Sequence, residues 1–295
     1  MTIFHDESYQ KHASAFEGYV TNPERQRVAD SWLDTSTADY WRHARSYDIA
    51  RILGNVPGET WLTVGDGRFG LDAQRLTERG AAAVLPTDLS ETLLKTAKEN
   101  GAISEYSIEN AEHLSFADAS FDYVFCKEAY HHFPRPMKAL YEMLRVARKG
   151  VILIEPNDKQ HAPARIAKIA LKRLLGRATN AEGENYEEDG NYVFSISKRE
   201  IEKVALGLNL PQVAFKGLND YYAVGIEFQK LESSMGRKMR LHIALCDALC
   251  TAGLNMPSML MACIFHQPLI ADKRKAMIEA GWKIKDLPRN PYHPG

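Results

Sequence analysis

A glycine-rich turn that follows an apolar run constrains the fold of this chain more than any other feature of its sequence. The turn, Val64-Gly65-Asp66-Gly67-Arg68-Phe69-Gly70, separates a strand-like run at 60–64 from a helical period at 71–79. Glycines in this place permit a tight turn and let the backbone approach a ligand closely. Asp88 follows roughly 20 residues after Gly67, the spacing expected of an adenosine-type nucleoside site. Its carboxylate can accept hydrogen bonds from both hydroxyls of a ribose.

Apolar runs alternate with helical periods beyond this turn. Further runs lie at 82–86, 121–126 and 150–155, a weaker one lies at 103–108, and helical periods lie at 90–100 and 137–147. The run at 150–155 is almost continuously apolar, as expected for a strand whose two faces are both covered. This rhythm predicts an α/β fold with a doubly wound, mostly parallel sheet.

We expect four segments along the chain. They are an N-terminal helical cap (1–55), an α/β core (56–156), a lid insertion with substrate-side helices and sheet completion (157–258), and a last strand with a C-terminal tail (259–295). A basic amphipathic helix at 164–177 would form a lid that binds an anionic substrate or a membrane surface. The alternative is a solvated helix whose charges pair with the acidic residues at 181–190.

Composition narrows the class of protein. The 295 residues carry a formal net charge of −1, which argues against broad binding of a nucleic-acid backbone. The four cysteines form no CxxC pair, so we expect free thiols in a reducing cytosol and no metal. A polar N-terminus and the lack of a run of about 18 apolar residues predict a cytoplasmic protein without an integral membrane span. Homo-oligomerisation is left open.

Three downstream stretches carry a family resemblance. They read Asn110-Ala111-Glu112-His113-Leu114-Ser115-Phe116-Ala117-Asp118-Ala119-Ser120-Phe121-Asp122-Tyr123-Val124, His131-His132-Phe133 and Arg145-Val146-Ala147-Arg148-Lys149-Gly150. Together with the glycine turn, they make residues 58–156 resemble the class I S-adenosylmethionine-dependent methyltransferases, particularly the ubiquinone and menaquinone C-methyltransferases. The resemblance implies a seven-stranded, Rossmann-like sheet of order 3-2-1-4-5-7-6 with the last strand antiparallel. It also implies S-adenosylmethionine as cofactor and in-line methyl transfer to O, N or C of a small-molecule acceptor.

The same resemblance implies roles for individual residues. The residues that would contact the cofactor are Gly65, Asp66 and Gly67 at the methionine half and ribose edge, Asp88 at the ribose hydroxyls, Leu89, Asn110 and Ala111 at the adenine, and Lys127 through its backbone near the methionine moiety. Thr63 departs from the family, which usually has an acid there, and Phe69 stands where a third glycine is often found.

Two pairs of residues are candidates for contact with the reacting groups. His131 and His132 would act as general bases, or would instead pack and cap the next helix. The segment Asp39-Tyr40-Trp41-Arg42-His43 would close over the cofactor. Tyr40 or Trp41 would cover the sulfonium by a cation–π contact and Arg42 would bind the cofactor carboxylate, unless this aromatic stripe belongs to the core.

Two other functions remain open at this point. The glycines Gly65, Gly67 and Gly70 also fit a nicotinamide-dependent oxidoreductase, although that class does not account for residues 110–124. Thr63 also fits an S-adenosylmethionine binder with non-standard or no methyl transfer.

Overall fold

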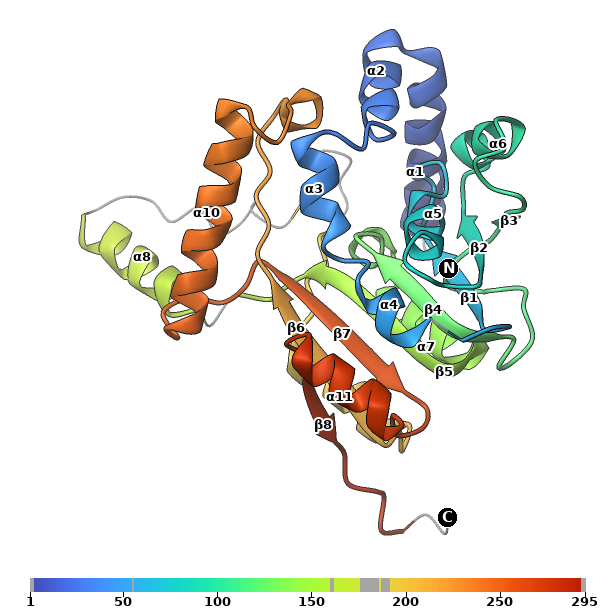
Figure 1. Cartoon of the computed structure of the whole chain (residues 1–295), viewed down its shortest axis with the longest axis vertical. Helices are drawn as coiled ribbons and strands as arrows, with labels where there is room; N and C mark the ends of the chain where they lie inside the picture. The colour runs from blue at the N-terminus through green and yellow to red at the C-terminus, as the bar shows by residue number, and fades with distance from the viewer. Residues whose placement is uncertain (1–2, 55, 160–161, 176–185, 187–191, 293–295) are drawn as a thin grey trace.

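The computed structural model of the chain, which describes residues 3–54, 56–159, 162–175, 186 and 192–292, contains one sheet of order β3-β2-β1-β4-β5-β7-β6-β8 (Figure 1). Its strands are β1 (Thr60–Val64), β2 (Ala83–Asp88), β3 (Ser107–Ile108), β4 (Phe121–Lys127), β5 (Ala147–Pro156), β6 (Gln212–Leu218), β7 (Met259–Phe265) and β8 (Lys283–Asp286). Strands β1 to β5 pair in parallel, and β7 is antiparallel to both β5 and β6. The predicted doubly wound α/β fold is confirmed.

The strand count differs from the prediction. An eighth strand, β8, pairs antiparallel with β6 at the edge of the sheet. The chain reaches this edge through a helix after β7, and the buried side chains of Trp282 and Leu287 anchor it on either side of β8. Residues 271–286 are therefore ordered structure, where the sequence suggested only a tail. The division into four segments otherwise stays a prediction.

Helices precede, follow and separate the strands. They are α1 (Ile3–Thr21), α2 (Pro23–Ser31), α3 (Ala38–Ala44), α4 (Ile49–Leu53), α5 (Leu71–Thr77), α6 (Thr92–Glu99), α7 (Pro136–Val146), α8 (Pro163–Leu174), α9 (Lys198–Gly207), α10 (Ser234–Thr251) and α11 (Ala271–Glu279), with short 3-10 helices η1 (Tyr130–His132) and η2 (Ile226–Phe228). The basic helix expected at 164–177 corresponds to α8. Arg177 and the acidic residues between 181 and 190 lie outside the described residues.

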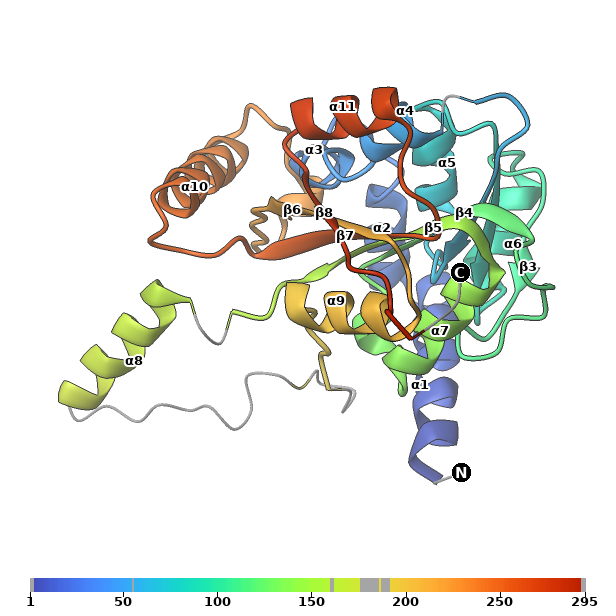
Figure 2. The ribbon, with the colours of Figure 1, turned by 90° about the horizontal axis from the view of Figure 1, so that it is seen from below.

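Both faces of the sheet are covered, as Figure 2 shows. Alternate side chains of β5 point to opposite faces of the sheet. Val151 and Leu153 belong to the apolar cluster that includes α7 and α9. Ile152 and Ile154 belong to the cluster that includes α4, α5 and α11. This burial on both sides explains why the run at 150–155 is apolar without alternation. The weaker run at 103–108 forms a strand only at Ser107–Ile108.

Helices α1 and α2 pack beside α6. Phe16 and Tyr19 of α1 pack with Trp32 and with residues of α6 in a separate apolar cluster. This packing places α1 beside the carboxyl ends of β1 and β2. Among the described residues, none of the helices has the length and apolarity that crossing a bilayer requires.

Candidate active site

A cavity of about 280 Å³ lies at the carboxyl ends of β1, β2 and β4. This is where ligands bind in open parallel sheets. Its lining includes most of the residues predicted for the site, namely Gly65, Asp66, Asp88, Leu89, Asn110, Ala111, Lys127 and His132. Tyr40, Arg42, Gly67 and His131 are not among its lining residues.

The glycine turn forms one wall of this cavity. Gly65 has a left-handed φ of 79°, and the N–H groups of Gly65 and Asp66 donate to Thr87 O at 3.0 and 2.9 Å. A Cβ placed on Gly67 would lie 2.7 Å from Cγ of Asp88. The backbone therefore passes against the carboxylate at the end of β2 so closely that position 67 excludes a side chain.

Asp66 is buried beside Thr63, the residue that stands where the family usually has an acid. Its carboxylate accepts the hydroxyl of Thr63 at 2.8 Å and the N–H groups of Asp72 and Ala73 at 3.0 and 2.9 Å. Burial and neighbouring Asp72 raise the pKa of Asp66, and these three donors oppose the shift. The carboxylate thus caps the start of α5 from within the cavity wall.

Asp88 is 4% exposed at the end of β2. Its Oδ1 accepts the N–H of Ser90 at 2.8 Å and lies 3.4 Å from Nε2 of His12 on α1. His12 and Phe16 both line the cavity, and Phe16 lies 2.8 Å from the Cβ position of Gly67. Helix α1 therefore covers this end of the cavity. The sequence alone did not indicate this role for α1.

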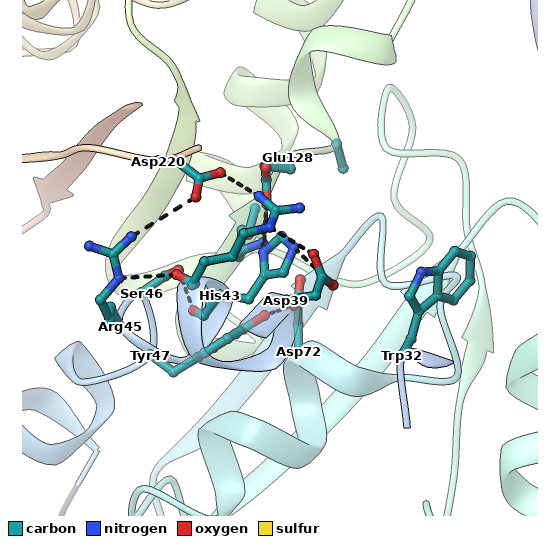
Figure 3. Close-up of polar contacts among 12 residues, drawn as sticks. Trp32, Asp39, His43, Arg45, Ser46, Tyr47, Asp72, Glu128 and Asp220 are labelled. Atoms are coloured by element: carbon teal, nitrogen blue, oxygen red, sulfur yellow. Dashed lines mark hydrogen bonds and ion pairs between the residues drawn. The ribbon is translucent and has the colours of Figure 1, made fainter. Parts of the chain in front are cut away.

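A charged cluster closes the other end of the cavity. Figure 3 shows Asp39 and His43 of α3 with Glu128. The Nδ1 atom of His43 lies 2.8 Å from Nζ of Lys127 and 3.2 Å from Oε2 of Glu128, and its Nε2 atom lies 3.8 Å from Oδ2 of Asp39. Lys127 and Glu128 also contact each other. The cluster therefore places both signs of charge beside the carboxyl end of β4.

Burial and charge together set the pKa values in this cluster. Burial and the Lys127 ammonium lower the pKa of His43, while Glu128 opposes them. Burial alone would raise the pKa of Asp39, but the charges of His43 and Arg42 lower it. Likewise, Lys127 and His43 outweigh burial and hold the pKa of Glu128 well below its ordinary value. The surroundings therefore favour the ionised forms of Asp39 and Glu128 and disfavour a protonated His43.

Tyr40 and Arg42, which the sequence suggests for the cofactor, do not line the cavity, and the geometry of α3 accounts for their positions. Residues 39 and 43 are one helical turn apart and share the face toward the cavity, so residues 40 and 42 point to its sides. Arg42 is buried between Asp39, at 2.7 Å, and Asp220. The guanidinium of Arg75 lies over the ring of Tyr40, with its Cζ atom 5.2 Å from the centroid of that ring.

The two predicted histidines have different surroundings. His131 is buried, and its Nδ1 lies 2.5 Å from Oε2 of Glu155. The other oxygen of Glu155 accepts the N–H groups of Ala129 and Tyr130, so His131 belongs to the support of the turn after β4. His132 lines the cavity.

Comparison with known proteins identifies the family. Residues 62–154 match the methyltransferase domain family. A ubiquinone biosynthesis O-methyltransferase of Neisseria meningitidis serogroup C is 34% identical over 167 residues, which cover 52% of this chain and 70% of that protein. The chain is a class I S-adenosylmethionine-dependent methyltransferase. This membership supports methyl transfer over the nicotinamide-dependent oxidoreductase.

Two further comparisons agree with this methyltransferase fold and family. A demethylmenaquinone methyltransferase of Renibacterium salmoninarum is 34% identical over 127 residues, or 43% of this chain and 51% of that protein. The solved complex between the Haloferax volcanii Trm112 methyltransferase activator and a methyltransferase contains a chain of the same fold. That chain has a TM-score of 0.52 and 13% identity, over 90% of this chain and 98% of that one.

The cavity of this methyltransferase fits S-adenosylmethionine. At one end the backbone of the glycine turn lies against the Asp88 carboxylate, where an added Cβ at Gly67 would collide. At the other end charges of both signs lie on Asp39, Lys127 and Glu128. A nucleoside with a diol suits the first end, and a zwitterionic amino-acid group suits the second.

Proposed function

We propose that this cavity binds S-adenosylmethionine and is the place where the enzyme methylates O, N or C of a small-molecule acceptor. The close approach of Gly67 to the buried Asp88 carboxylate, in a cavity at the carboxyl ends of parallel strands, carries the proposal. The names of the relatives, which include quinone-biosynthesis methyltransferases, support a small-molecule acceptor.

Each predicted cofactor residue has a role in this proposal. Asp88 accepts the ribose hydroxyls, because a carboxylate is suited to a cis-diol. Leu89 and Ala111 pack against the adenine and Asn110 meets its edge. Backbone atoms at Gly65 and Lys127 face the methionine half, as does the wall formed by Asp66.

The bound cofactor supplies an electrophilic methyl group on a sulfonium, so the protein's part is alignment and exclusion of water. Helix α1 covers Asp88 and excludes water from this end of the cavity. His12, His43 and His132 line the cavity, and His12 lies against Asp88. Where the acceptor atom carries a proton, one of these imidazoles takes it. His131 then acts as a positioning residue, through the turn that holds His132.

Calorimetric titration tests the proposal. The wild-type chain should bind S-adenosylmethionine and S-adenosylhomocysteine but not NAD. Asp88→Ala should weaken binding of S-adenosylhomocysteine by about 1.5–3 kcal/mol, the range for hydrogen bonds to a charged group.

Asp118→Ala is the matched control, since Asp118 has an exposed side chain and lies outside the cavity. It should bind as the wild type does. Wild-type affinity in Asp88→Ala would remove Asp88 from the nucleoside site.

A further inference from the structure

Helix α8 stands away from the sheet and from α9, as Figure 2 shows. Its sequence, PARIAKIALKRL, contains four basic residues and no acidic one. The sequence of this segment has an amphipathic pattern, with basic residues recurring at 165, 168 and 172. Ala170, Leu171 and Leu174 are spaced i, i+1, i+4 and share an apolar face.

The apolar face of α8 is open. The exposed fractions are 57% for Leu171 and 84% for Leu174, and 53% for Ile166 at the edge of the same face. A 12-residue helix is marginal in water without packing of its apolar face. The face therefore needs a partner that covers it.

Helix α10 presents a second surface of the same kind. Both views place α8 and α10 at the end of the molecule away from β3. Leu241 and Leu245 of α10 are 72% and 58% exposed, and Arg237, Lys238 and Arg240 in its first half are exposed as well. Both helices, at this same end of the molecule, thus combine exposed leucines with positive charge.

We propose that α8, assisted by α10, docks on the surface of an anionic lipid bilayer. An interfacial helix inserts its apolar face at the headgroup boundary while its basic residues reach anionic headgroups. A second copy of the chain is a poorer occupant, because a symmetric contact through the leucines of α8 would leave its basic residues without an anionic partner. The exposed leucines also distinguish this surface from one that binds only phosphate groups.

Sedimentation with lipid vesicles tests the docking of the full chain. The chain should sediment with vesicles of phosphatidylcholine mixed with phosphatidylglycerol, and it should stay in the supernatant with vesicles of phosphatidylcholine alone. Added salt should release it, because screening weakens attraction between exposed charges. Lys172→Ala should weaken partitioning about fivefold, the effect of one basic residue near an anionic surface.

Substitutions on the apolar face separate the lipid surface from other occupants. Leu174→Glu should abolish sedimentation with the anionic vesicles. Ile278→Glu on α11, where Ile278 is similarly exposed at 54%, is the matched control and should sediment as the wild type does. Circular dichroism checks that both variants are folded.

Three results would overturn the proposal. The first is an absence of binding to anionic vesicles at low salt, as expected if the charges of α8 are already neutralised within the chain. The second is wild-type sedimentation of Leu174→Glu. The third is a dimer in light scattering that Leu174→Glu dissociates, which would assign the face to a second copy. Calorimetry with S-adenosylhomocysteine on the same variants should show unchanged affinity, so failure of docking is distinguishable from failure of the cofactor site.

Discussion

The two ends of the cavity are built in different ways. At the nucleoside end the backbone itself forms the wall: the N–H groups of Gly65 and Asp66 are fixed on Thr87 O, and Gly67 lies against Asp88. At the charged end the wall is made of long side chains from α3 and from the residues after β4.

This difference affects how each end tolerates change. A backbone wall has a fixed shape and fails when a side chain is added to it. A wall of ionised side chains holds its shape only while every charge has a partner, because an unpaired buried charge is costly. The charged end is therefore sensitive to the loss of any one of its charges.

Removing the charge of Arg42 should have the largest effect. Arg42→Met leaves Asp39 and Asp220 without their shared guanidinium, which is 9% exposed. Breaking a buried pair in this way should lower the free energy of unfolding by about 3–5 kcal/mol. Urea unfolding measures it.

Arg51→Met is the matched control for this loss. Arg51 pairs with Asp48 at the same i, i+3 spacing, but its side chain is 68% exposed. The control should cost at most about 1 kcal/mol. Equal losses in the two variants would mean that burial of the charged end does not matter.

Adding one methyl group to the backbone wall should be the next largest effect. In Gly65→Ala the new Cβ would lie 2.3 Å from Cβ of Ala129, on a residue with a φ of 79°. The left-handed conformation and the overpacking together should lower the free energy of unfolding by roughly 2–5 kcal/mol.

Gly101→Ala separates these two causes. Gly101 also has a left-handed φ, 73°, but a Cβ there would meet nothing within 4 Å. It should cost only the conformational part, about 1–2 kcal/mol. If urea unfolding gives the same loss for both variants, the contact between the glycine turn and the segment after β4 is not tight.

The sequence predicted the parts of the glycine-turn end because they are local: the strand at 60–64, the turn and Asp88 follow one another in the chain. The strand register then brings Val64 beside Thr87. The sheet order was predicted by the family resemblance and not by the apolar runs. Strand β8 was missed because its sequence, Lys-Ile-Lys-Asp, carries one apolar residue, and pairing with β6 rather than composition makes it a strand.

The charged end could not be predicted in the same way. His43 and Lys127 are 84 residues apart in the chain, and Arg42 and Asp220 are 178 apart. The sequence did single out the segment 39–43, but which of its side chains face the cavity depends on how α3 is rotated. A helical spacing of four between Asp39 and His43 was the available signal, and it was outweighed by the aromatic residues between them.

Acidification should produce the smallest effect, through His43. Burial and Lys127 lower the pKa of His43 in the folded protein, with Glu128 opposing, whereas the unfolded chain binds this proton near pH 6.5, roughly the ordinary value. The unfolded state therefore binds more protons as the pH falls from about 6.5 toward the lowered pKa, and the folded protein loses stability in that window. Above about pH 6.5 the residue contributes no pH dependence.

In His43→Asn the part of the pH dependence of the unfolding free energy that arises from His43 should vanish. The unfolding free energy, measured in urea at several pH values below neutrality, should then fall less steeply with acid than in the wild type. His242→Asn is the control, because His242 is exposed on α10, and it should keep the wild-type slope. A wild-type slope in His43→Asn would mean that Glu128 balances Lys127 and burial at this imidazole. In that case the charged end would not lower the pKa of His43. The two ends of the cavity would then differ in shape and not in their effect on a titrating group.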